Sequence, residues 1–300
     1  MRSLLIAALL FGGLVKAQVA NVPAAFERIA EKPTAITYNA GQNHLPKGGH
    51  IQGIQEYVAD SSTYIVLTGS SSSYSYYLSS GEGWQTQWGY RYSPAVRKLF
   101  DSPLRHAGGC QIHGKWLAVG IEDNIGKSES IIALIDLSNG KVDTVLERKG
   151  TYKRSTAGAV GYTKTVDETQ WIAVGDWDSR HIDFYQYHIA THHFYWVGTY
   201  TATTANWPAF QSINLVSDSA GKLFLLGFSL YQGKNRADLF QVNFENGVEL
   251  KLISTRYFKC ENGTGFRFGA GVVIKEDALS IIASARNLKK RNKANIFSEK

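Results

Sequence analysis

A module that recurs five times constrains this chain more than any other feature of its sequence. Each copy has a short run containing small residues, a turn, and an apolar run that ends in a polar loop, as in His106–Gly109 followed by Trp116–Gly120. The copies start at residues 50, 106, 155, 210 and 268, so they are 49 to 58 residues apart. Two more strand-like runs follow within a copy, for example Ser130–Asp136 and Val142–Glu147, joined by an Asn-Gly turn that favours a hairpin. Four strands repeated at this period are typical of propeller blades. The sequence therefore predicts an all-β fold, a five-bladed β-propeller.

The last copy is too short to form a complete blade by itself, because only 32 residues follow Phe268. The N-terminal run Ala25–Ile29 resembles the outer strands of the other copies, such as Val145–Arg148. We predict that an N-terminal strand pairs within the last blade and closes the ring, which removes an otherwise open sheet edge.

The first 17 residues have the pattern of a secretory signal. Arg2 precedes an apolar run from Leu4 to Leu14, and Ala17 is a small residue at the expected cleavage position. The run is too short to span a bilayer, and no later run is longer. The sequence thus predicts a signal peptide at 1–17, a single β-propeller domain at 18–300, and a secreted protein, periplasmic or extracellular, with no membrane span.

The net charge and the two cysteines limit which partners and which disulfide we expect. The formal net charge is +7, and the basic run Lys289–Lys293 reads as a solvated turn, so we expect no nucleic-acid partner. An oxidising compartment would favour a disulfide between Cys110 and Cys260. Their predicted positions, an inner strand of one blade and the end of an outer strand of another, argue against it, since bridging needs Cα atoms within about 7 Å.

The propeller geometry predicts where a site would lie. The first strand of a blade begins on the face where its second strand ends, so both meet at one mouth of the central channel. The strand starts contribute His50, Gln52, His106, Gln211 and Arg267, and the ends of second strands contribute Glu122, Asp176, Trp177, Asp178 and Arg286.

These residue types suggest three kinds of role at the mouth. The predicted ligand-binding residues are His50, Gln52, His106, Trp177, Gln211, Arg267 and Arg286. If the protein is an enzyme, Glu122, Asp176 and Asp178 are the acid and base candidates, because crowded carboxylates have pKa values that move apart. His50 and His106 are also candidate ligands for a divalent metal, although both imidazoles have an alternative role as packing and hydrogen-bonding groups. No known catalytic signature is present.

The fivefold pattern with His-x-x-Gly at two strand starts resembles secreted five-bladed β-propellers. That class includes sugar-binding lectins and glycosidases that use carboxylates at the channel mouth, so the resemblance implies a carbohydrate-related function. The glycosidases of this class have an aspartate on the first inner strand, where this chain has His50 and Gln52.

Three hypotheses for the function follow. The leading one is a secreted protein that binds a small polar ligand, a carbohydrate or glycan, at the channel mouth; the aromatic stretch 83–92 supports it because exposed rings stack on sugar faces. The second is a hydrolase acting on a glycoside or phosphoester through the same mouth. The third is a protein-interaction scaffold.

Overall fold

Strands dominate the structure. The computed structural model describes residues 19–39, 45, 47–59, 62–71, 76–81 and 103–300. Within these ranges the chain forms nineteen strands, one short α-helix and one 3-10 helix, so the prediction of an all-β fold is confirmed. The predicted signal peptide 1–17 and the aromatic stretch 83–92 lie outside the described residues. No helix in the described ranges is both long and apolar enough to cross a membrane.

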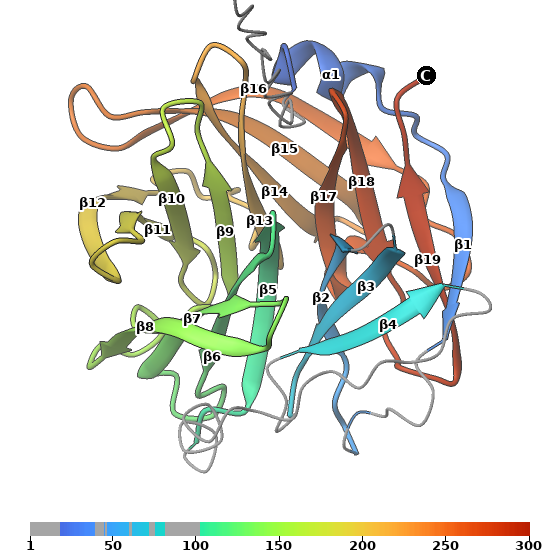
Figure 1. Ribbon diagram of the computed structural model, residues 1–300, viewed down its shortest axis with the longest axis horizontal. Helices are drawn as coiled ribbons and strands as arrows, with labels where there is room; N and C mark the ends of the chain where they lie inside the picture. Colours follow the sequence, from blue (N-terminus) through green and yellow to red (C-terminus); the bar gives the residue numbers. More distant parts are fainter. Residues whose placement is uncertain (1–18, 40–44, 46, 60–61, 72–75, 82–102) are drawn as a thin grey trace, which may run out of the picture.

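Consecutive strands pair antiparallel in groups, as Figure 1 shows. The first group contains β2 (Ile51–Ala59), β3 (Ser62–Gly69) and β4 (Tyr77–Gly81), and the second contains β5 (His106–His113), β6 (Trp116–Glu122), β7 (Glu129–Asp136) and β8 (Lys141–Lys149). The third contains β9 (Ala159–Lys164), β10 (Gln170–Gly175), β11 (His181–His188) and β12 (His193–Thr201), and the fourth contains β13 (Ser212–Ser217), β14 (Leu223–Tyr231), β15 (Lys234–Asn243) and β16 (Glu249–Phe258). The last group contains β17 (Ala270–Lys275), β18 (Ala278–Ser284), β19 (Arg291–Phe297) and the N-terminal strand β1 (Thr34–Asn39). The 3-10 helix η1 (Phe266–Phe268) precedes β17.

Hydrogen bonds merge these groups into larger sheets. The order β17-β18-β19-β1-β4-β3-β2 forms a seven-stranded sheet through two residue pairs between β1 and β4. An eight-stranded sheet forms where β5 and β9 share one parallel pair, Gly109 with Ala159, and β13 to β16 form a sheet of four strands. The first strands of the groups, β2, β5, β9, β13 and β17, contact one another in that order, and β17 contacts β2 again.

Buried amide side chains connect these first strands. Gln55 on β2 donates to the Cys110 carbonyl and to Oδ1 of Asn214, each at 3.1 Å. Oε1 of Gln111 on β5 accepts from the backbone N–H groups of Tyr162 and Leu215 at 2.7 Å. The amides therefore satisfy buried backbone groups where neighbouring strands are too far apart to share a full ladder.

Gly109 lies where the backbones of two inner strands approach each other closely, and this explains why the residue is a glycine. A Cβ added to Gly109 would lie 2.7 Å from the Gln211 carbonyl oxygen, whereas one added to Gly158 would meet nothing nearer than 3.6 Å. We expect Gly109→Ala to lower the free energy of unfolding by about 1–3 kcal/mol through overpacking. Gly158→Ala, at the equivalent place in the next module, is the control and should change it by much less. Urea unfolding of both variants measures the difference, and equal losses would contradict the steric explanation.

The N-terminal segment corrects one prediction and confirms another. Residues 25–29 are not a strand: residues 25–28 belong to α1 (Val22–Arg28), and Ile29 is its C-cap. The helix starts at Val22 because the side chain of Asn21 accepts from the Ala24 N–H at 2.9 Å and a proline occupies the first turn. The strand comes later. β1 pairs antiparallel with β19, from Thr34 opposite Ile296 to Asn39 opposite Arg291, so an N-terminal strand does complete the last group.

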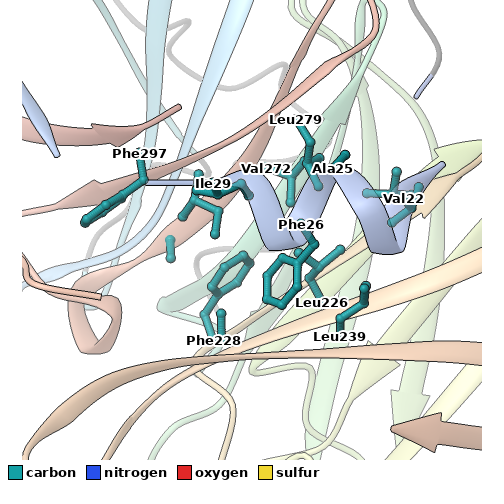
Figure 2. Packing of buried hydrophobic residues seen from close by; sticks show 14 of the residues in the cluster. Val22, Ala25, Phe26, Ile29, Leu226, Phe228, Leu239, Val272, Leu279 and Phe297 are labelled. Carbon is teal, nitrogen blue, oxygen red and sulfur yellow. The ribbon is translucent and has the colours of Figure 1, made fainter. Parts of the chain in front are cut away.

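Helix α1 packs over a hydrophobic cluster between the last two strand groups. Figure 2 shows Phe26 pointing into a cluster with Phe228 and Leu226 on one side and Val272 and Leu279 on the other. Phe26 is fully buried. Four further clusters of buried apolar side chains lie between or within groups, so the hydrophobic core is divided among the contacts between neighbouring groups.

The two cysteines are free. Cys110 is buried on β5, and Cys260 follows β16. Burial raises the pKa of the Cys110 thiol to about 12 and that of Cys260 to about 11. Both thiols are therefore protonated and unreactive at neutral pH.

Candidate functional site

Two histidines, a glutamine and a glutamate form a connected network where β2 and β5 begin. Nε2 of Gln52 lies 2.6 Å from Nε2 of His50 and 3.0 Å from Nε2 of His106. Nδ1 of His106 lies 3.1 Å from Oε1 of Glu122. The pairing of β5 with β6 explains this contact, because His106 and Glu122 are directly opposite each other in the register. The network thus joins side chains from two neighbouring strand groups.

The hydrogen bonds define one consistent protonation state. The Gln52 amide has two N–H donors, so each imidazole accepts at Nε2 and carries its proton on Nδ1. Nδ1 of His50 then donates to the Ser70 hydroxyl, 2.8 Å away, whereas Nδ1 of His106 lies beside Glu122 without a directed hydrogen bond. Burial, followed by the nearby charges of His106, Arg286 and Arg267, lowers the pKa of His50. Its imidazole is therefore neutral at pH 7, as the network requires.

Glu122 is the most buried member of the network. Its side chain is 1% exposed, and Oε2 accepts a hydrogen bond from the backbone N–H of Ala157 at 2.9 Å. This contact holds the carboxylate against the neighbouring strand group and leaves Oε1 facing His106. A fixed carboxylate behind an imidazole orients the ring and stabilises its protonated form.

Trp177 and Lys127 lie beside this network. The ring of Trp177 is half-buried, 6.2 Å from that of His106, and Nζ of Lys127 lies 3.9 Å from the Trp177 ring centroid. Lys127 was not among the residues predicted from the sequence. It could have been found from the turn after β6, because Asp123 accepts from the N–H groups of Ile125 and Gly126, both at 2.9 Å, and this turn brings the chain back toward the site.

The exposed Arg267 and Arg286 complete the surroundings of His50. Arg267 belongs to η1, and the carbonyl of Arg286 accepts the Ile51 N–H at 2.9 Å, which places it at the start of β2. The charges of both guanidinium groups act on His50. The edge of the site therefore carries two imidazoles, one half-buried indole and two exposed guanidinium groups.

Three other predicted residues make their polar contacts elsewhere. Asp176 accepts from the backbone N–H of Arg180 at 2.9 Å and from Nδ1 of His181 at 2.6 Å. Asp178 pairs with Lys153 at 2.9 Å. Gln211 donates its backbone N–H to Phe228. Among the three predicted carboxylates, Glu122 alone contacts an imidazole of the network in the described part of the chain.

The arrangement suits polar recognition more directly than metal binding. The described residues contain no group of three or more His, Cys, Asp or Glu side chains arranged to hold a metal ion. Nε2 of both predicted metal ligands, His50 and His106, already faces the Gln52 amide. The network instead offers amide, imidazole and guanidinium groups beside an aromatic ring, a combination that binds hydroxyl-rich ligands.

Comparisons with known proteins show a likeness of fold. No family model matches the sequence, and no curated protein is similar to it. An exo-β-1,3-galactanase from Phanerochaete chrysosporium with galactose superposes with a TM-score of 0.53 and 9% identity, over 88% of this chain and 64% of that chain. A GH43 β-xylosidase/α-arabinofuranosidase from a compost microbial metagenome gives 0.52 and 9% identity, over 88% of this chain and 95% of that chain. This chain therefore spans less than two thirds of the length of the galactanase.

Proposed function

We propose that this protein is a secreted five-bladed β-propeller that binds a carbohydrate at the channel mouth. The observation that carries the proposal is the network of His50, Gln52, His106 and Glu122, with Trp177 beside it. The two imidazoles hold the Gln52 amide N–H groups, so the amide oxygen of Gln52 is proposed to accept from a sugar hydroxyl, and the indole contacts the apolar face of the sugar ring. Arg267 and Arg286, whose charges act on His50, are proposed to contact the ligand as well.

Two further observations support the architecture in this proposal. The first strands of the five groups contact one another in a closed cycle, as inner strands around a central axis do. The fold also resembles two glycoside hydrolases, one solved with galactose and the other with xylotriose. Galactose-based and xylose-based oligosaccharides are therefore the first ligands to test.

The second candidate is hydrolysis of a glycoside or phosphoester. It is favoured by the Glu122–His106 pair, in which a buried carboxylate orients a potential acid or base. Hydrolysis by two carboxylates requires their oxygens to converge within roughly 5–10 Å across one cleft. Asp176 and Asp178 are held by His181 and Lys153 instead. We therefore propose carbohydrate binding first and keep hydrolysis as the alternative.

Calorimetric titration with β-1,3-galactotriose and xylotriose tests the proposal. We expect one of them to bind, and Trp177→Ala to weaken binding about tenfold or more, since losing the burial of a large apolar side chain costs about 1.5–3 kcal/mol. Trp196→Ala is the matched control, because Trp196 is 63% exposed on the outer strand β12. Equal losses in both variants, or no binding of either sugar, would count against the proposal. Release of smaller sugars during the titration would favour the hydrolase.

A further inference from the structure

A cavity lies toward the opposite ends of the same inner strands. Its volume is about 690 Å³. The residues that line it include Glu56 in the second half of β2, Ile112 near the end of β5, and Lys275 at the end of β17. His50, Gln52 and His106 are at the starts of β2 and β5, so the cavity and the histidine network are at different ends of these strands. A cavity of this size accommodates a small organic molecule.

The lining of the cavity includes three exposed apolar side chains. Val58, Val166 and Ile189 line it and are 58%, 47% and 44% exposed. They come from three separate parts of the chain, the end of β2, the turn after β9 and the turn after β11. Large apolar side chains gathered around one opening mark a binding surface. The body of the ligand is therefore apolar.

The buried carboxylate of Glu56 is the feature of the cavity that would contact the polar end of a ligand. The Glu56 side chain is only 4% exposed, and its Oε1 is buried without a directed hydrogen bond. Nζ of Lys275 lies 2.6 Å from that oxygen, but the Lys275 side chain is 60% exposed. The lysine can therefore move into water at little cost, whereas the glutamate cannot.

The other charged groups of the lining have partners of their own. Lys115 is bonded to Asp136, and Lys164 pairs with Glu168, whose side chain is 59% exposed. Glu56 is thus the most buried carboxylate that lines the cavity, and an ammonium already contacts it. We propose that the cavity binds a small primary amine with an apolar body, whose ammonium replaces that of Lys275 on Glu56 while its body contacts Val58, Val166 and Ile189.

Titration of the full protein with hexylamine, hexanol and hexanoate at pH 7 tests this site. We expect hexylamine to bind about tenfold or more tightly than hexanol, since hydrogen bonds to charged groups are the stronger ones. Glu56→Gln should abolish this preference. Lys275→Met should strengthen amine binding, because it removes the internal competitor. Glu276→Gln, a change in the exposed turn after β17, is the control and should bind like the unchanged protein.

The outcomes separate this site from the histidine network. His106→Ala should leave hexylamine binding unchanged, and Glu56→Gln should leave sugar binding unchanged, so either proposal can fail alone. If one single variant does not fold, the double variant Glu56→Gln with Lys275→Met replaces the ion pair by neutral groups and should lose the amine preference. Tighter binding of hexanoate, or a preference for the amine that survives Glu56→Gln, would overturn the inference.

Discussion

Replacing Phe26 with alanine is expected to lower the free energy of unfolding by about 3–5 kcal/mol, the range for deleting a buried aromatic ring. Phe26 is fully buried, and the cluster around it includes side chains of α1, β14, β15, β17 and β18. Those strands are fixed by their own ladders and cannot collapse into the space that the ring leaves. The loss therefore includes a cavity term as well as the lost burial of apolar surface. Urea unfolding followed by tryptophan fluorescence measures it.

A matched control separates burial from aromatic content. Tyr152 is 62% exposed, and Tyr152→Ala should change the free energy of unfolding by less than about 0.5 kcal/mol. A loss below about 1 kcal/mol for Phe26→Ala would mean that α1 contributes little to the stability of the strand groups. The helix would then be an appendage rather than part of the core.

Replacing Asp183 with asparagine is expected to cost about 3 kcal/mol or more, because it leaves a buried guanidinium without its counter-charge. Asp183 accepts from Arg148 at 2.6 Å, from Arg154 at 2.5 and 2.6 Å, and from the Thr199 hydroxyl at 2.5 Å. The Arg148 side chain is only 8% exposed. Asp178→Asn is the control, since the Asp178–Lys153 pair is about 40% exposed on both sides and such pairs contribute little.

The same carboxylate predicts how stability depends on pH. Burial alone would raise the pKa of Asp183, but the hydrogen bonds from Arg154 and Thr199 and the charge of Arg148 outweigh it and lower the pKa below 3.8. The stabilisation is therefore complete above the ordinary aspartate pKa and is lost as the pH falls through the lower value of the folded state. The difference between Asp183→Asn and the unchanged protein should shrink below about pH 4. An undiminished difference at pH 3 would contradict this origin.

Local signals in the sequence were sufficient for the strands and their hairpins. The Asn-Gly turn between Asp136 and Lys141 joins β7 and β8 as predicted, and the small-residue runs that start at residues 106 and 155 lie at or just before the inner strands β5 and β9. The N-terminus was harder to predict. The run Ala25–Ile29 looks like a strand by composition, but the cap at Asn21 and the following proline start a helix. Capping outweighed the resemblance to other modules.

The sequence predicts only the part of the candidate site that depends on strand register. Strand register brings His106 opposite Glu122 and leaves Gln52 between the two histidines, and register follows from the repeat. The directions of Asp176 and Asp178 depend on turn conformation. Asp176 binds N–H groups of its own turn, so its carboxylate faces His181. No pattern of residue types in the repeat contains that information.

The pairing of β1 with β19 has a consequence for synthesis. Thr34 lies opposite Ile296, so β1 has no partner on that side until almost the whole chain has left the ribosome. At translation rates of about 5–20 residues per second, this delay is roughly 10–50 s. During that time an unpaired strand and the apolar face of α1 are exposed to other nascent chains. Chaperones that hold extended segments are therefore expected to matter more for the yield of this protein than for one whose first strand pairs with its second.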